Sequence, residues 1–138
     1  MNKKFLKIEL DLDFCLIAII SPLKDYRLCF LINKFLNTNY ERTLMDYCIS
    51  YPNAQSKYFS QFYYKNTSDN DCYIISNKGA EGYLIPEMKE TDYFILLRNF
   101  CDKEELQFIL THLKQIKEIQ IALEINPSTL KSKENLIF

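Results

Sequence analysis

The stretch Asn77–Leu97, NKGAEGYLIPEMKETDYFILL, decides how the rest of the chain is arranged. It holds both glycines of the chain, Gly79 and Gly82, three positions apart. Glycine reaches positive φ without steric cost, so this spacing predicts a tight turn. Pro86 fixes its own φ and favours an extended conformation for the residue before it, which predicts a short extended piece. We refer to residues 79–92 as the elbow.

A strand is expected directly after the elbow. Asp92–Leu97 is short and carries aromatic and aliphatic side chains on both faces. That pattern is typical of a central strand covered on both sides, because a half-exposed strand alternates apolar and polar residues.

Ile85–Tyr93, the end of the elbow and the residue after it, reads IPEMKETDY. This stretch resembles the signature of a family of short, uncharacterised bacterial proteins named for an Ile-Pro-Glu-x-x-x-Val-Asp-Tyr string. Lys24–Leu28, Ile75–Lys78 and Leu130–Leu136 are also similar to that family, so the resemblance extends over the whole chain. Thr91 stands where the signature has Val; both are β-branched, so entry into the next strand should be kept. The resemblance implies a bacterial cytoplasmic protein and supplies no catalytic residues.

Length and composition predict one globular domain, 1–138, with a real hydrophobic core. The net charge of −1 and the scattered basic residues argue against a polyanion-binding surface. Five cysteines without a C-x-x-C pair indicate reduced core thiols in a cytoplasmic protein. Glu9, Asp11 and Asp13 interrupt the apolar region that a signal peptide needs. The longest apolar run, Phe14–Ile20, is too short to span a bilayer, so no membrane partner is expected.

The first part of the chain is expected to form a strand and a helix. The alternation in Ile8–Phe14 predicts a strand with carboxylates outward. Carboxylates two apart could share a cation, but a solvated strand face is favoured, and no metal or other cofactor is expected. Cys15–Ile20 fits either a continuation of the strand or a short helix. Ser21 and Pro22 predict the N-cap and first position of a helix that extends to about Asn37.

The remaining signals complete an α+β pattern. Asp102 and Glu105 form a capping-box arrangement before a helix whose apolar stripe runs from Leu106 to Ile116. Gln120–Glu124 alternates as a last strand. Three further strands are expected at Leu44–Tyr51, Lys57–Lys65 and Asp71–Ser76. The prediction is a two-layer sandwich, with a mainly antiparallel sheet of about six strands and two principal helices.

Arg27 lies on the first predicted helix, whose apolar side chains cover almost its whole circumference. A guanidinium buried in that setting needs an anionic partner. Glu87, Glu90 and Asp92 of the elbow are the candidate partners, and we call this predicted contact the clasp. Alternatively, Arg27 binds the phosphate or carboxylate of a ligand. The candidate residues for the ligand site or clasp are Arg27, Glu87, Asp92, Tyr93, Gly79, Gly82 and Pro86.

No catalytic motif stands out, because the chain has no phosphate-binding glycine loop, nucleophile elbow or two-histidine metal motif. An enzyme would have to use Tyr93, Arg27, His112 and the pair Glu87 and Asp92, and a structural role for these residues is favoured.

The leading function hypothesis is therefore a non-catalytic interaction domain that forms a homodimer through Leu136–Phe138 or an exposed aromatic strand, or binds another protein. The second is a small-ligand or nucleotide-binding regulator with Arg27 as anion anchor. The third, single-stranded RNA on the aromatic strand Lys57–Lys65, is opposed by the slightly acidic net charge.

Overall fold

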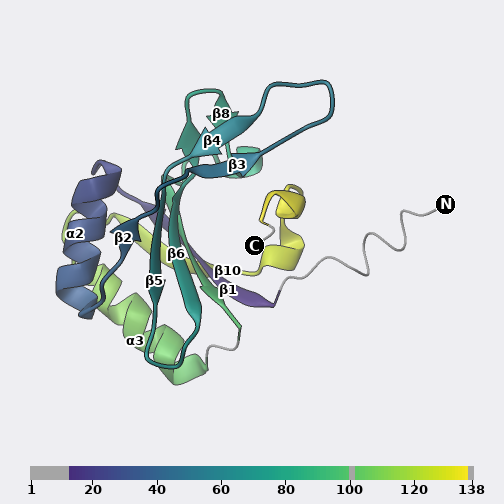
Figure 1. The fold of residues 1–138 in the computed structure, drawn as a ribbon. Coiled ribbons are helices and arrows are strands. Elements are labelled where there is room, and N and C mark those ends of the chain that lie inside the picture. Colours follow the sequence, from purple (N-terminus) through teal and green to yellow (C-terminus); the bar gives the residue numbers. More distant parts are fainter. Residues whose placement is uncertain (1–12, 100–101, 137–138) are drawn as a thin grey trace.

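A computed structural model describes residues 13–99 and 102–136. Six strands form one antiparallel sheet in the order β10-β1-β9-β6-β5-β2 (Figure 1). They are β10 (Ile121–Ile125), β1 (Phe14–Ile20), β9 (Tyr93–Arg98), β6 (Asp71–Ser76), β5 (Gln61–Lys65) and β2 (Glu41–Arg42). Two α-helices, α2 (Asp25–Leu36) and α3 (Lys103–Lys114), lie on one face of this sheet. The predicted α+β class with a mainly antiparallel sheet is confirmed.

The two middle strands of the sheet are β9 and β6, and β1 lies next to β9. Residues 15–20 adopt the strand alternative, because β1 pairs with β10 on one side and β9 on the other. The apolar stretch after the elbow is β9, and it is buried on both faces from Tyr93 to Leu97. Of the strand predicted at Ile8–Phe14, only the last two residues lie within the described part of the chain.

Two hydrophobic cores flank the sheet. On the helix face, Ile17, Ile74 and Ile95 of the sheet share a core with Leu28 of α2 and Leu110 of α3. The opposite face, which we call the second face, forms another core with the elbow, the C-terminal turns and a hairpin of β3 (Tyr47–Ile49) and β4 (Lys57–Phe59). Its members include Leu16, Phe94, Phe59, Leu84, Ile85, Leu130 and Leu136.

The hairpin on the second face corrects two predicted strands. The stretch predicted as one strand from Lys57 to Lys65 is β4 (Lys57–Phe59) and β5, which belong to different sheets on either side of Ser60. The break lets Phe59 enter the second-face core and Phe62 enter the helix-face core. The strand predicted at Leu44–Tyr51 shortens to β3 (Tyr47–Ile49), which pairs with β4.

The two helices differ in how well their starts were predicted. Asp102 caps α3 as expected, because its carboxylate accepts the Glu105 N–H at 2.7 Å. In contrast, α2 begins at Asp25, after the extended N-cap residue Lys24, so the start predicted at Ser21 is wrong. Ser21 instead donates its hydroxyl to the Glu118 carbonyl at 2.9 Å and so joins the lead-in of α2 to the loop before β10.

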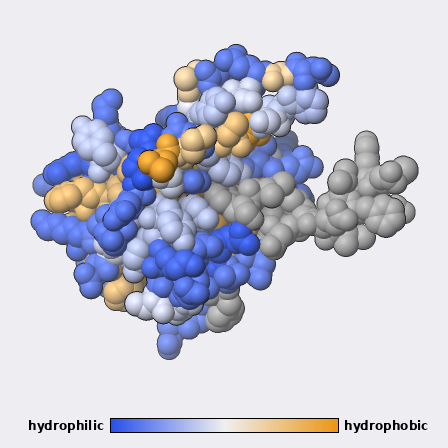
Figure 2. All heavy atoms as spheres, viewed as in Figure 1, coloured by the Kyte–Doolittle hydropathy of each residue, from blue (hydrophilic) through white to orange (hydrophobic). Residues whose placement is uncertain are grey.

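The visible surface is mostly hydrophilic, with hydrophobic patches over α2 and between α2 and the β3–β4 hairpin (Figure 2). Phe30 of α2 and the loop residues Leu44 and Met45 are among the exposed apolar side chains. Within residues 13–99 and 102–136, no helix has the length and apolarity needed to cross a membrane.

Candidate functional site

Asn77, two residues before the elbow, binds it at several points. Its side chain is fully buried, and its Nδ2 donates to the carbonyls of Met88 and Thr91 at 2.9 and 2.8 Å. Its Oδ1 accepts the Ile85 N–H at 2.7 Å, and its own N–H donates to the Asp92 carbonyl at 2.9 Å. One amide therefore satisfies three backbone groups across the elbow, two of them in buried hydrogen bonds, a role that the sequence analysis did not assign to it.

The predicted glycine turn is confirmed, and glycine is needed at its two positions for different reasons. The short strands β7 (Lys78–Gly79) and β8 (Gly82–Tyr83) form a hairpin. A Cβ at Gly79 would lie 2.5 Å from the Tyr58 carbonyl oxygen of β4, so this position requires the absence of a side chain. Gly82 has φ +143°, a conformation that L side chains rarely adopt.

The residues directly before Pro86 are extended, as predicted. Ile85 is extended, with φ −120° and ψ 92°, and it is fully buried in the second-face core. Pro86 then begins a single 3-10 turn, η1 (Pro86–Met88), which ends the extended piece. The elbow thus folds over the second face of the sheet and does not project into solvent as a whole.

Asp92 is held by two partners from other segments. Its Oδ1 lies 2.7 Å from the Lys78 Nζ, and its Oδ2 accepts the Ser21 N–H at 2.8 Å. The hydrogen bond to Asp92 raises the pKa of Lys78. The carboxylate therefore ties the glycine turn to the lead-in of α2.

The predicted clasp is wrong, because Arg27 takes no part in it. Arg27 is exposed, its guanidinium lies 5.4 Å from the Phe30 ring centroid, and no salt bridge among the described residues includes it. The helix buries only one face, through residues such as Leu28 and Ile32, and leaves Tyr26 66% and Phe30 53% exposed. Arg27 consequently needs no buried counterion. Glu90 is also exposed.

The partner of Glu87 is the C-terminal segment and not Arg27. Its carboxylate accepts the Ser132 N–H at 2.9 Å and the Ser132 hydroxyl at 2.8 Å. Partial burial raises the pKa of Glu87, but the two Ser132 hydrogen bonds oppose it, and the net pKa lies below the ordinary value of 4.5. This pair joins η1 to the turn before η3 (Lys133–Asn135).

We expect Ser132→Ala to raise the pKa of Glu87 toward 4.5, because the variant removes the hydroxyl donor. A folded-state pKa below the unfolded value means that the pair stabilises the fold at neutral pH and that this contribution is lost as the pH falls through the folded pKa. A carboxyl NMR titration measures the shift. The Ser128 hydroxyl bonds to Asn126 and not to Glu87, so Ser128→Ala should leave the Glu87 pKa unchanged. An unaltered Glu87 pKa in Ser132→Ala would contradict the assignment.

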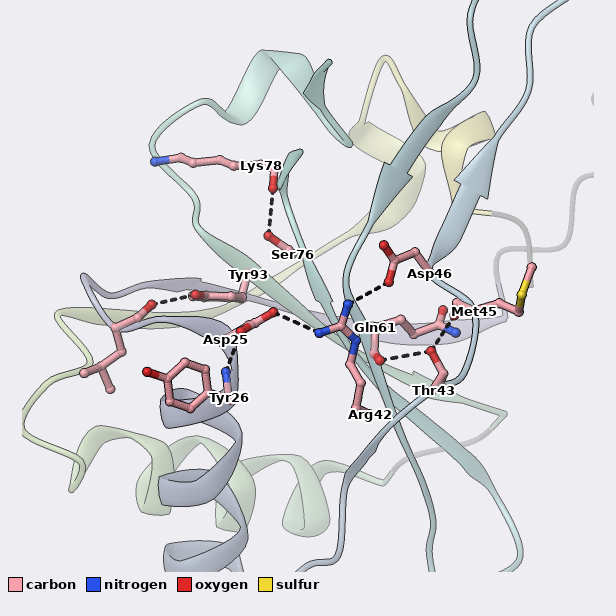
Figure 3. A network of polar contacts seen from close by, with 11 residues as sticks. Asp25, Tyr26, Arg42, Thr43, Met45, Asp46, Gln61, Ser76, Lys78 and Tyr93 are labelled. Atoms are coloured by element: carbon pink, nitrogen blue, oxygen red, sulfur yellow. Dashed lines mark hydrogen bonds and ion pairs between the residues drawn. The ribbon is translucent and has the colours of Figure 1, made fainter. Parts of the chain in front are cut away.

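An open hollow of about 440 Å³ lies beside the elbow, and Tyr93 and Gly79 line it together with Lys24, Asp25 and Ser76 among others. The Tyr93 hydroxyl points back to the Leu23 carbonyl at 2.5 Å (Figure 3). Burial raises the pKa of Tyr93 to about 12, so at neutral pH it keeps its proton and is unsuited to act as a base.

An ion-pair network includes Asp25, which also lines this hollow (Figure 3). Arg42 of β2 lies 2.8 Å from Asp46 and 3.5 Å from Asp25 at the start of α2, with its guanidinium 5.6 Å from the Phe62 ring centroid. The Arg42 guanidinium therefore holds Asp46, in the segment after β2, near the start of α2. Its partly exposed pairs contribute about 0–1 kcal/mol each.

The two edges of the sheet differ in their protection. The β2 edge has two residues, both charged and exposed, with Arg42 in the ion pairs above. The β10 edge has five residues, and within the described ranges β10 pairs only with β1. Ile121 and Leu123 of β10 are 43% and 45% exposed. A long, apolar, unpaired edge is a template for another strand, whereas a short charged edge is not.

The other candidate residues of the sequence analysis have structural explanations. The His112 ring packs against the Phe108 ring on the flank of α3, with the ring centroids 4.0 Å apart and the planes tilted by 37°. The His112 Nδ1 lies 2.8 Å from the Phe108 carbonyl oxygen. Cys29 and Cys72 are buried thiols as predicted, but Cys48 is exposed on β3. In the described part of the chain, no three His, Cys, Asp or Glu side chains are arranged to hold a metal ion.

Comparisons with protein-family models, with curated proteins and with solved structures gave no match to this chain.

Proposed function

We propose that this chain is a non-catalytic interaction domain that associates with a second copy of itself through the open edge of β10. The contrast between the protected β2 edge and the exposed β10 edge carries the proposal. The interface expected at Leu136–Phe138 is not supported, because Leu136 is fully buried in the second-face core of its own domain. Residues 137–138 lie outside the described part of the chain.

The backbone groups available on the β10 edge follow from the ladder. The Asn99 N–H donates to the Asp13 carbonyl at 3.2 Å, and backbone groups alternate along a strand between its two neighbours. The odd-numbered residues of β1 therefore bond to β9 and the even-numbered ones to β10. The latter lie opposite Ile121, Leu123 and Ile125, so these three bond to β1. The N–H and C=O groups of Ala122 and Glu124 point to the open side.

These directions favour an antiparallel pairing about a two-fold axis at Leu123. Ala122 of each copy then bonds to Glu124 of the other, which overlaps the full strand and places no like charges opposite each other. A register centred on Glu124 would set the two carboxylates side by side. At the axis the two Leu123 side chains form the closer, non-hydrogen-bonded pair on the second face.

The surface around Leu123 fits an apolar partner. A shallow groove of about 230 Å³ adjoins the strand, and Ile20, Met88, Ile121 and Leu123 line it with others. Its apolar lining continues the β10 row across β1 toward the elbow. Side chains from a second β10 would therefore remove contiguous apolar surface from water, which is the main driving force of association.

We expect the full chain to form a concentration-dependent dimer and Glu124→Pro to be monomeric. Proline removes the outward N–H of residue 124 but none of the bonds to β1, so an edge strand can tolerate it. Leu123→Lys should also give a monomer, because it places a charge at the axis. Sedimentation velocity over a range of concentrations measures both.

The matched controls keep the edge intact. Glu124→Ala retains the N–H and Leu44→Lys places a charge on an exposed apolar residue away from β10, so both should dimerise like the unmodified chain. A chain that stays monomeric at the highest concentration, or a Glu124→Pro variant that still dimerises, would refute the proposal.

A further inference from the structure

A second hollow, of about 270 Å³, lies on the helix face at the end of the sheet away from the elbow. Its floor is a row of side chains on adjacent strands, since Tyr64 of β5 lies opposite Cys72 of β6 and Cys72 lies opposite Leu97 of β9. Tyr40, which follows α2, and Ile109 of α3 line its walls. We call this space the hairpin pocket after the β5–β6 hairpin, whose turn forms part of its rim; the β3–β4 hairpin takes no part in it.

A small side chain stands in the middle of the pocket floor. Cys72 lies between the larger Tyr64 and Leu97, and the nearby first turn of α3 contributes Glu105, not an apolar residue that could fill the space. Burial raises the pKa of Cys72 to about 12, so the floor is uncharged at neutral pH. Apolar atoms on the floor can gain dispersion contacts when a bound molecule packs against them.

The rim of the pocket is polar and locally fixed. The Asn66 Oδ1 accepts the N–H groups of Ser68 and Asn70 at 3.0 and 2.9 Å. The Asn70 Oδ1 accepts the Asn99 Nδ2 at 3.0 Å. These bonds occupy the oxygen atoms of Asn66 and Asn70 and leave the Nδ2 groups of both as donors at the rim.

Glu105 and Arg98 complete the rim with one negative and one positive charge. The carboxylate of Glu105 is exposed and supplies hydrogen-bond acceptors next to the amide donors. The rim therefore offers donors and acceptors together without a net charge.

Size and charge narrow the class of ligand. The volume lies just below the roughly 300–1,000 Å³ of pockets that hold drug-sized molecules, so a single ring system fits better than a dinucleotide. The lining contains one cationic side chain, Arg98, whereas phosphate groups are usually held by clustered cations or backbone N–H groups. The aromatic and aliphatic floor and walls suit the faces of a planar ring.

We propose that the hairpin pocket binds an uncharged, nucleobase-sized heteroaromatic ring. One face of the ring packs against Tyr64, and its polar edge bonds to the Asn66 and Asn70 amides and to Glu105. The site uses none of the β10 edge, so it is independent of self-association.

Saturation-transfer NMR on the full chain tests the site with adenine, uracil, indole and adenosine monophosphate as probes. Adenine and uracil should bind. Indole has no acceptor on its edge and should bind more weakly than adenine, and adenosine monophosphate should bind no more tightly than adenine. Failure of both nucleobases to bind at millimolar concentration, equal binding of indole, or tighter binding of the nucleotide would overturn the proposal.

Two variants locate the binding. Cys72→Leu fills the floor and should weaken adenine binding by about tenfold or more, equivalent to about 1.4 kcal/mol. Glu105→Ala removes an exposed acceptor without disturbing the core and should also weaken it. Cys48→Leu, an exposed cysteine on β3, is the matched control and should bind adenine like the unmodified chain. Adenine affinity unchanged in both pocket variants would place the ligand elsewhere and refute the site.

Discussion

Asn77→Ala is expected to lower the free energy of unfolding by about 4 kcal/mol. The substitution leaves the carbonyls of Met88 and Thr91 and the N–H of Ile85 without their partner, and each buried unsatisfied group costs about 1–3 kcal/mol. Loss of all three groups at one site belongs to the small class of substitutions with effects above the usual range. Because a domain has only about 5–15 kcal/mol of stability, a loss of this size removes a large fraction of it.

Urea denaturation measures this effect, with two asparagine controls that make fewer bonds. Asn39→Ala removes one exposed bond of 3.4 Å to Glu41 and should change the stability by less than about 0.5 kcal/mol. Asn135→Ala removes a donor to the Leu84 carbonyl at 2.7 Å and should fall between the two. If Asn77→Ala unfolds at the same urea concentration as Asn39→Ala, the Asn77 amide does not hold the elbow in place.

The role of Asn77 could not be predicted from the sequence because asparagine is common in loops and turns of every kind. The sequence did mark the elbow, through two glycines and a proline. What it could not show is that the segment folds back over a sheet, so that the amide of Asn77, just before the elbow, reaches carbonyls 11 and 14 residues later. Contacts of that kind depend on the path of the chain, not on local preference.

The elements that local signals specify were predicted well. Asp102 with Glu105 gave the start of α3, and the compact apolar stretches gave β6 and β9 within one residue at each end. The break at Ser60 was missed because aromatic residues on both sides of it favour a strand equally. Only the presence of two cores, one on each face of the sheet, separates β4 from β5.

The partners of the candidate residues were assigned less well than their positions. The acidic side chains of the elbow do make specific contacts, but Asp92 binds Lys78 and Ser21, and Glu87 binds Ser132. Arg27 was chosen because the count of apolar residues on its helix suggested full burial. That count cannot separate a buried face from exposed rings such as Tyr26 and Phe30, which the structure places at the surface.

The second large effect is expected for Gly79→Ala, which should lower the free energy of unfolding by about 1–3 kcal/mol. The added Cβ would lie 2.5 Å from the Tyr58 carbonyl oxygen and 3.0 Å from the Phe59 ring, so β4 must move away from the elbow. The obstacle is backbone and a fully buried ring, which cannot relax as a flexible side chain does. Gly79→Val should be more destabilising than Gly79→Ala, since a steric cause grows with the size of the side chain.

The location of the damage distinguishes this steric cause from a change in turn conformation. Displacement of β4 weakens its pairing with β3, so amide hydrogen exchange in Gly79→Ala should quicken in Tyr47–Ile49 and Lys57–Phe59 while β9 and β6 stay protected. Gly82→Ala meets only the Lys57 side chain, 3.2 Å from its Nζ, and its cost comes from φ +143°, so its faster exchange should be confined to the β7–β8 turn. Glu81→Ala, an exposed residue of the same turn, should leave exchange and stability nearly unchanged. Protection of the β3–β4 hairpin in Gly79→Ala equal to that in Glu81→Ala would show that β4 does not depend on the bare backbone at residue 79.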